Sequence, residues 1–163
     1  MNQNPLVKLL FNRGGIGQSM SRSETVERVN PLIEQHMRLN KGYNTVIETL
    51  SDDEIAEQLQ AFQKTARADV GKLAETILSA GGTAYNGVEL RDVTFDLGED
   101  DTDRLFALRD REQALHEAVT DELKDNHQMR TRAILEVVQA NSAERLDYLK
   151  GVTKRRNRRT PTS

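Results

Sequence analysis

The stretch TAYNGVELRDVTFDLGED, residues 83–100, decides which fold this chain can adopt. It lacks the three-and-four spacing of apolar residues that marks an amphipathic helix, although the residues on both sides of it have that spacing. Its middle part, VELRDVTFDL, alternates apolar and polar residues like a strand, but a single strand in a helical protein has no partner to pair with. A connection of this length is unusual within one domain unless it spans a helical bundle from end to end. We therefore predict a crossover here.

The residues before the crossover predict two long helices joined by a tight turn. Pro31 leaves two starts open for the first helix, one near Glu24 and one with Asn30 as N-cap and Pro31 as the first helical residue. SDDE at 51–54 fits a capping box for the second helix, and Gly81-Gly82 fits its end. Because the turn is short, the two helices must be antiparallel. Their apolar seams are Val29, Ile33, Tyr43, Ile47 and Leu50, then Ile55, Leu59, Phe62, Ala66, Leu73 and Ile77.

The residues after the crossover predict a second pair of helices. Acidic residues at 100, 101 and 103 suit the positive end of the third helix, and Asn126 separates it from a fourth helix that ends near Lys150. The whole order predicts an all-α four-helix bundle, made of two antiparallel helical hairpins joined by the long crossover. We expect this domain over 24–152, between a flexible N-terminal lead at 1–23 and a basic, disordered tail at 153–163. The seams are Leu105, Leu108, Leu115, Val119 and Leu123, then Ile134, Val137, Val138, Leu146 and Leu149.

The composition agrees with one helical domain. A chain of 163 residues can bury one core, and its 36% hydrophobic, 30% charged and 4% aromatic residues suit a water-exposed bundle better than a β-sandwich. The absence of Cys excludes disulfides, thiolate nucleophiles and zinc ribbons, so any metal must be held by oxygen and imidazole. The apolar run PLVKLLF is too short to span a membrane, and a cytoplasmic location is expected.

Positive charge is concentrated near the C-terminus. The net charge is −3, and the basic tail at 154–159 holds five of the Lys and Arg residues, so that removing those five leaves −8 on the rest of the chain. One interpretation of the tail is an arm that binds the phosphate groups of nucleic acid or anionic lipid, with a strong dependence on salt. The interpretation we prefer is a solvated terminus, or one docked on a neighbouring subunit of a homo-oligomer, because the body itself is acidic.

Local motifs along the predicted helices form a recognisable series. They are Asn30-x-Leu32-Ile33-Glu34, Gly42-Tyr43, Gly81-Gly82 and Glu112. In these motifs and in the order of its elements, the chain resembles the ferritin-like fold, and over roughly residues 26–150 it resembles an uncharacterised bacterial family of small ferritin-like proteins. This resemblance implies the same four-helix bundle and an association with stress. The wider superfamily binds two irons with a Glu from each of two helices and a Glu-x-x-His pair from each of the other two.

The chain departs from that ligand pattern. Only Glu112 has the expected ligand type, and a standard di-iron oxidase or iron store is therefore not expected. The other positions hold Ala66-x-x-Asp69 on the second helix, Asn141-x-x-Glu144 on the fourth and His36 on the first.

Polar residues nevertheless interrupt the apolar seam in the middle of every helix. Burying an unpaired carboxylate costs several kcal/mol, so these side chains must pair, bind a metal or lie beside water. One interpretation is a site for iron, manganese or zinc, in which Glu112 and His116 share a helix face. The other is a hydrogen-bonded polar layer that keeps the helices in register. The candidate metal ligands are Glu112, His116, His36, Asp69 and Glu144.

Three functions remain open. No Ser-His-Asp, Cys-His or Glu-x-x-His arrangement is visible, so no catalytic residue is assigned and an enzyme is not expected. We prefer a bundle of structural or interaction type with a degenerate metal site. The alternatives are an iron- or manganese-binding protein that uses the five candidate ligands, and a nucleic-acid-associated protein that uses the basic tail.

Overall fold

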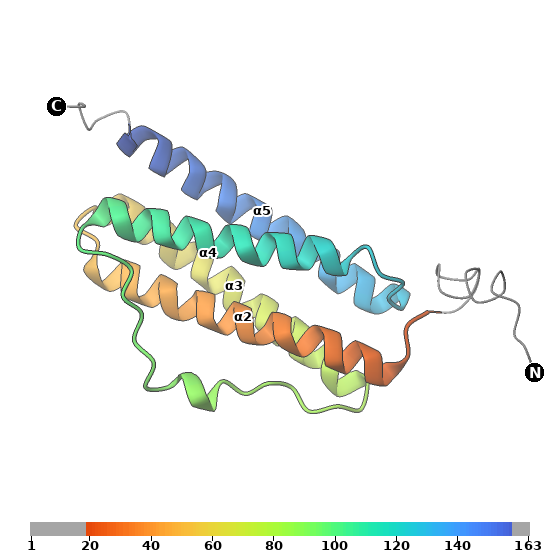
Figure 1. Ribbon diagram of the computed structural model, residues 1–163. Coiled ribbons are helices and arrows are strands. Elements are labelled where there is room, and N and C mark those ends of the chain that lie inside the picture. Colours follow the sequence, from red (N-terminus) through yellow and green to blue (C-terminus); the bar gives the residue numbers. More distant parts are fainter. Residues whose placement is uncertain (1–18, 158–163) are drawn as a thin grey trace, which may run out of the picture.

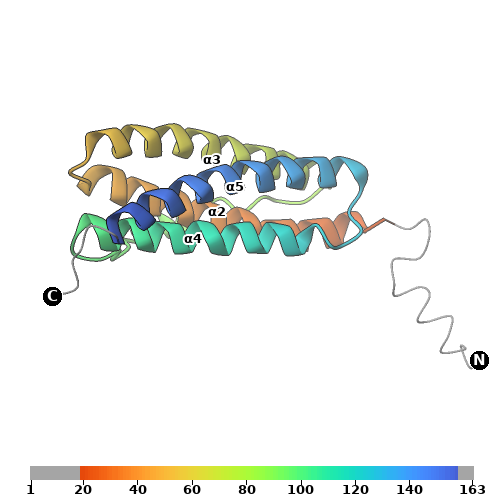
Figure 2. The ribbon, with the colours of Figure 1, turned by 90° about the horizontal axis from the view of Figure 1, so that it is seen from above.

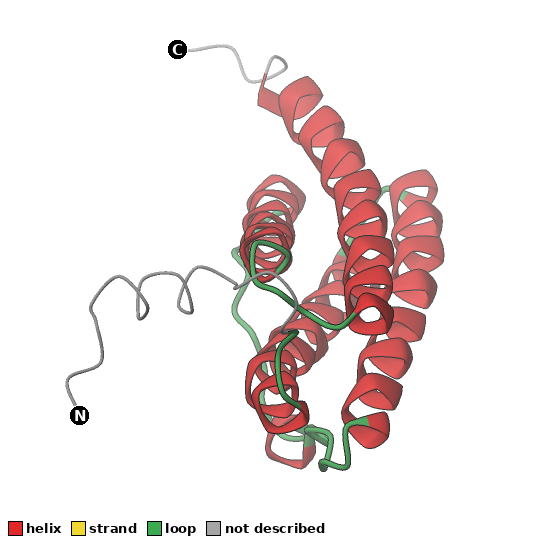
Figure 3. Cartoon of the chain, turned by 90° about the vertical axis from the view of Figure 1, so that its right-hand side faces the viewer, coloured by secondary structure: helices red, strands yellow, loops and turns green. Residues whose placement is uncertain are grey.

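Residues 19–157 are described by the computed structural model, and within them all regular structure is helical (Figures 1 and 3). This confirms the predicted all-α class. The predicted N-terminal lead and basic tail fall mostly outside the described residues, which include only 19–23 of the lead and 153–157 of the tail. The elements are α2 (Arg22–Thr49), α3 (Asp53–Ser79), the short 3-10 turn η1 (Val88–Leu90), α4 (Asp101–Glu122) and α5 (Met129–Asn157).

The four helices form two hairpins, as the sequence predicts. Helix α2 packs against α3 and α4, and α5 packs against α4 and α3 (Figure 2). The segment 80–100 leaves the end of α3 and runs back along α2 to the start of α4, so it is a crossover and not a strand (Figure 1). Its Leu90 and Leu97 are buried, which holds it against the bundle.

Helix α2 begins at Arg22, close to the first of the two predicted starts, near Glu24. Its N-cap is Ser21, whose hydroxyl accepts a hydrogen bond from the Glu24 amide at 3.2 Å, while the Glu24 carboxylate accepts one from the Ser21 amide at 2.8 Å. The alternative start at Asn30 is wrong, because Pro31 lies inside the helix. Pro31 removes the N–H that would bond the Glu27 carbonyl, but both residues are exposed, so water can take the place of that N–H.

Asn30 does not cap a helix, as one of the predictions had it, but bonds to the crossover. Its side-chain oxygen accepts a hydrogen bond from the Tyr85 amide at 2.8 Å, and its amide nitrogen donates to the Thr83 carbonyl at 3.0 Å. The residue therefore fixes the beginning of the crossover to the first half of α2.

The other helix ends differ from the predicted ones by small shifts. The N-cap of α3 is Asp52, which accepts from the Ile55 amide at 3.1 Å, so the capping box predicted from Ser51 is wrong by one residue. Gly81, with φ of +82°, follows the end of α3 as predicted. Helix α5 continues past the expected end near Lys150, because Val152 and Thr153 extend its buried stripe.

The core is an apolar column that runs between all four helices. Its fully buried apolar side chains include Val29, Ile33, Tyr43, Leu59, Leu73, Ile77, Leu105, Leu108, Leu115, Val119, Leu135, Val138 and Leu149.

None of the helices within 19–157 combines the length and the hydrophobicity that a membrane crossing requires.

Candidate functional site

The apolar column is interrupted near its middle by a cluster of buried polar side chains centred on Glu112. Glu112 in α4 is 0% exposed, and Arg145 in α5 is 1% exposed. The Arg145 guanidinium donates to both carboxylate oxygens of Glu112, through Nε at 3.0 Å and Nη2 at 3.0 Å. Two hydroxyls complete the shell, Tyr43 Oη from α2 at 2.8 Å and Ser142 Oγ from α5 at 2.8 Å. We call Tyr43, Glu112, Ser142 and Arg145 the Glu112 network.

Asp69 extends this network to α3. Its carboxylate is 0% exposed and lies 3.6 Å from Arg145 Nη1, which makes an ion pair without a hydrogen bond. The Asn141 side-chain nitrogen donates to both Asp69 oxygens, at 2.9 and 3.1 Å, and Lys72 Nζ donates at 3.3 Å. Each buried carboxylate thus has a cationic partner, which is what makes its burial tolerable.

Local sequence explains why these residues point inward. On α5 the buried stripe runs through Val138, Ser142, Arg145 and Leu149, at steps of four, three and four. On α4 Glu112 lies four residues after buried Leu108, so it occupies a core position of its helix. Polar residues therefore stand at apolar positions of the pattern on both helices of the second hairpin.

The electrostatics of the Glu112 network favour one protonation state. Burial opposes the charged form of Arg145, but the negative charge of Glu112 and its hydrogen bonds outweigh burial and raise the pKa of Arg145. Burial and then the Glu112 charge raise the pKa of Tyr43 well above its ordinary range. Arg145 is therefore a permanent cation, and Tyr43 keeps the proton that it donates.

His36 lies in the same interior but takes no part in the hydrogen bonding. It is 0% exposed, and neither ring nitrogen has a hydrogen-bond partner within 19–157. Burial, and secondarily the positive charge of Arg145, lower the pKa of His36 to about 3. The imidazole is consequently neutral over the physiological pH range, next to a cation that repels its proton.

The five predicted metal ligands are only partly brought together. Glu112, Asp69 and His36 are fully buried, whereas His116 is half-buried one turn after Glu112, with an unpartnered Nδ1. Glu144 is exposed, so its predicted place beside the others is wrong. The predicted register of α5 was off by one residue, because Ser142 and Arg145, not Asn141 and Glu144, lie on its buried stripe.

Sequence reasoning missed the two residues that matter most for the chemistry. The sequence pattern does not single out Arg145, since an Arg in a charged helix is usually solvated, and it assigns Tyr43 to the apolar core. The signal for Arg145 was its spacing of seven residues from Val138 and four from Leu149, both apolar.

A comparison with solved structures identifies a protein domain with a similar architecture. A two-domain protein from Anabaena variabilis, with DJ-1/ThiJ/PfpI-like and ferritin-like domains, superimposes with a TM-score of 0.73 at 12% identity. The match covers 88% of this chain and 40% of the other. The chain has a ferritin-like fold. No protein-family profile and no curated protein sequence matches it.

The residues of this bundle do not fit the metal centre that is found in ferritin-like di-iron proteins. That centre needs a Glu from each of two helices and a Glu-x-x-His pair from each of the other two. Here α5 presents Ser142-x-x-Arg145 and α3 presents Ala66-x-x-Asp69 to the interior, and a guanidinium stands between the two carboxylates. Among residues 19–157 no three His, Asp or Glu side chains are arranged to hold one metal ion.

Proposed function

We propose that this protein is a ferritin-like bundle of structural or interaction type, in which Arg145 replaces the metal as the cation at the centre. The observation that carries the proposal is the two-point contact between the Arg145 guanidinium and the Glu112 carboxylate, with Asp69 on the other side of Arg145. A metal ion and a guanidinium cannot both occupy the space between these carboxylates. Both carboxylate oxygens of Glu112 already accept two hydrogen bonds each, from Tyr43, Ser142 and Arg145.

The arrangement supports a structural role for the Glu112 network, in which its contacts fix the register of the four helices. A single layer of side chains connects α2 to α4 through Tyr43, α5 to α4 through Arg145 and Ser142, and α5 to α3 through the Arg145–Asp69 pair. Buried polar contacts of this kind specify the register in which helices pack. A cytoplasmic location remains a prediction from the sequence, and an association with stress remains what the family resemblance implies.

The experiment that tests this role combines metal analysis with stability. Wild-type protein, Glu112→Gln and the exposed control Glu136→Gln are incubated anaerobically with Fe(II) or Mn(II), desalted and analysed by elemental mass spectrometry. We expect no stoichiometric metal in any of them, and no change in melting temperature of the wild type. Stoichiometric metal that the wild type and Glu136→Gln retain but Glu112→Gln loses would overturn the proposal in favour of an iron or manganese site.

The stability arm asks whether Arg145 is the resident cation. Arg145→Met leaves Glu112 and Asp69 without their cation, and removing one member of a buried ion pair costs about 3–5 kcal/mol of unfolding free energy. The double variant Glu112→Leu/Arg145→Met should lose less than Arg145→Met alone, because it buries no unpaired charge at position 112. Equal losses in the single and the double variant would contradict the assigned pairing. If Arg145→Met does not fold, Ser142→Ala probes the same carboxylate more mildly.

A second candidate function rests on the basic end of α5. Arg109, Lys150 and Lys154 line one surface pocket, and the Arg109 guanidinium stacks 4.5 Å from the Phe106 ring centre. Nucleic-acid binding is the function that such a surface supports. Removing residues from 153 onward would damage the core, because Thr153 is buried. The test is therefore a gel-retardation assay of Lys150→Gln/Lys154→Gln against the control Lys64→Gln, and equal retardation would exclude this surface.

A further inference from the structure

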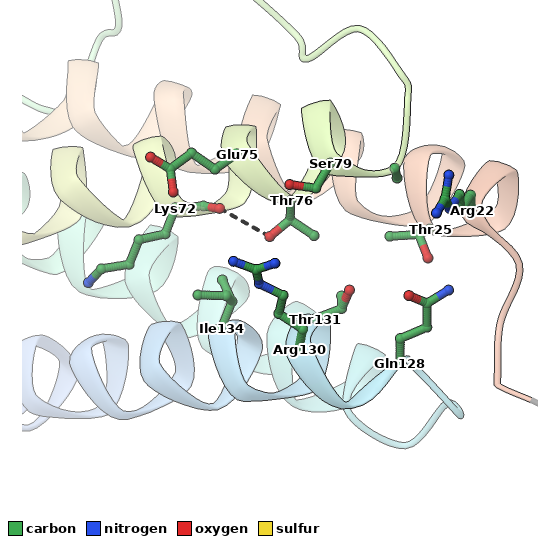
Figure 4. A pocket seen from close by; sticks show the side chains of 11 residues that line it. Arg22, Thr25, Lys72, Glu75, Thr76, Ser79, Gln128, Arg130, Thr131 and Ile134 are labelled. Carbon is green, nitrogen blue, oxygen red and sulfur yellow. Dashed lines mark hydrogen bonds between the residues drawn. The ribbon is translucent and has the colours of Figure 1, made fainter.

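A pocket of about 290 Å³ lies at one end of the bundle, where α2 and α5 begin and α3 ends (Figure 4). We call it the three-helix pocket. Arg22 and Thr25 line it from α2, Thr76 and Ser79 from α3, and Arg130 and Thr131 from α5. Figure 4 shows Arg130 reaching from α5 toward Thr76 of α3, with Arg22 and Thr25 at the other end of the hollow. No member of the Glu112 network lines this pocket, so it is a separate site.

The charge of the pocket is opposite to that of the protein. Three cations line it, Arg22, Lys72 and Arg130, against one acid, Glu75, while the whole chain has a net charge of −3. Lys72 also bonds to Asp69, but neither Arg22 nor Arg130 has an ion pair or hydrogen-bond partner for its guanidinium within residues 19–157. Two unpaired guanidinium groups on one pocket favour an anionic ligand.

A threonine hydroxyl in the same pocket also lacks a protein partner. Thr131 is 6% exposed, lines the pocket and makes no side-chain hydrogen bond within the described chain. The neighbouring hydroxyls differ, because Thr25 donates to the Ser21 carbonyl at 3.0 Å and Thr76 donates to the Lys72 carbonyl at 3.1 Å. The Thr131 oxygen is not one of the fully buried atoms that lack a partner, so it is open to the pocket and can donate to a ligand there.

The backbone adds to the positive potential. Arg22 lies at the N-terminal end of α2, and Arg130 and Thr131 lie in the first turn of α5. The positive end of the α5 dipole, which has no acid in its first turn, thus meets the same pocket as the two arginines, whereas the Glu24 carboxylate already offsets that of α2. Each contribution is modest alone, and their convergence on one cavity makes the site.

We propose that the three-helix pocket binds the phosphate group of a small phosphomonoester. Arg22 and Arg130 would each bind phosphate oxygens in the forked geometry that suits a guanidinium, and Thr131 would donate a further hydrogen bond. The net lining charge of three cations and one acid matches a dianion better than a carboxylate. The cavity volume is at the lower end for ligand pockets, which leaves room for only a small organic group beside the phosphate.

The test is a titration followed by amide NMR spectra of the full chain at constant ionic strength, with chloride as the compensating anion. Inorganic phosphate and glycerol phosphate are the two probes. We expect saturable shifts at the beginning of α2 and α5, and tighter binding of the ester than of free phosphate. Shifts that chloride reproduces, or that do not saturate, would overturn the site, and an ester that binds no tighter than free phosphate would overturn the organic subsite.

Matched variants locate the binding. Arg130→Gln and Arg22→Gln should each weaken binding about tenfold or more, which is the usual effect of losing a charge-assisted hydrogen bond. Thr131→Val should weaken it less while keeping the shape of the side chain. The control Arg91→Gln removes an exposed cation outside the pocket and should leave the affinity unchanged. An equal loss in Arg91→Gln and Arg130→Gln would mean general charge attraction and would overturn the assignment.

Discussion

His36 should make the protein sensitive to mild acid, and replacing it should remove that sensitivity. The imidazole is fully buried, without a hydrogen-bond partner, and faces the positive charge of Arg145. Burial first and that charge second lower the pKa of His36 to about 3 in the folded protein, against about 6.5 in an unfolded chain. Between these two values the unfolded chain binds a proton at His36 and the folded chain does not.

The sign and the size of the effect follow from this difference. As pH falls below about 6.5, proton uptake by the unfolded state lowers the free energy of unfolding by up to about 1.4 kcal/mol per pH unit. The loss continues until the pH reaches the folded-state pKa of about 3. Integrated from pH 7 to pH 5, the contribution of His36 is about 2 kcal/mol, and almost all of it arises below pH 6.5.

The assay is urea unfolding at pH 7 and at pH 5, followed by circular dichroism, for wild type and His36→Leu. Leu fills the core position, has no polar atom to leave unpartnered and cannot titrate. Between pH 7 and pH 5 the free energy of unfolding of His36→Leu should therefore fall by about 2 kcal/mol less than that of the wild type. Acidic groups titrate in both proteins, and comparing the two losses cancels them. The control Gln35→Leu, a change on the same helix that removes no titratable group, should retain the wild-type loss. Parallel losses in wild type and His36→Leu would refute the buried neutral imidazole.

Three further outcomes follow from contacts elsewhere in the chain. Tyr43→Phe removes one of the four donors to the buried Glu112 carboxylate and should cost about 1.5–3 kcal/mol of unfolding free energy in urea unfolding; a loss no larger than that of the control Tyr148→Phe, whose hydroxyl makes no hydrogen bond within residues 19–157, would contradict the contact. Asn30→Ala removes both bonds that hold the start of the crossover and should increase amide hydrogen exchange there by about tenfold, with the rest of the bundle unchanged. Gly82→Ala would place a Cβ 2.5 Å from the Val26 side chain, so calorimetry should show a loss of about 1–3 kcal/mol, partly restored by Val26→Ala.

The sequence was sufficient for the bundle because periodicity and turn chemistry act locally. The spacing of apolar residues, the Gly81 stop and the acids before α4 each determine a helix or its end within a few neighbours. The exceptions have tertiary causes. Ser51 does not cap α3, since its hydroxyl and amide bond to Asp101 of α4, which only the folded hairpins bring near. Asn30 likewise serves the crossover instead of starting a helix.

The centre of the bundle was predicted less well, because a shift of one residue in the register of α5 changes which side chains face the interior. The sequence indicated that polar residues interrupt every seam, and the burial of His36, Asp69 and Glu112 agrees with that. It did not indicate which residues on α5 face them. A shift of one position exchanges the anion Glu144 for the cation Arg145, and with it a candidate metal shell for an ion-pair layer.

The presence of Arg145 in the interior affects how the two hairpins are held in position along each other. The tight turns fix α2 against α3 and α4 against α5, but the long crossover leaves the sliding of one hairpin along the other undetermined. A purely apolar interface would tolerate several such positions, whereas Tyr43 and Arg145 reach their partners on the neighbouring hairpin at only one. In a metal-binding ferritin-like protein the ion could provide this constraint, and would do so only while it was bound. A guanidinium provides it permanently, because it is part of the chain and does not lose its charge at physiological pH.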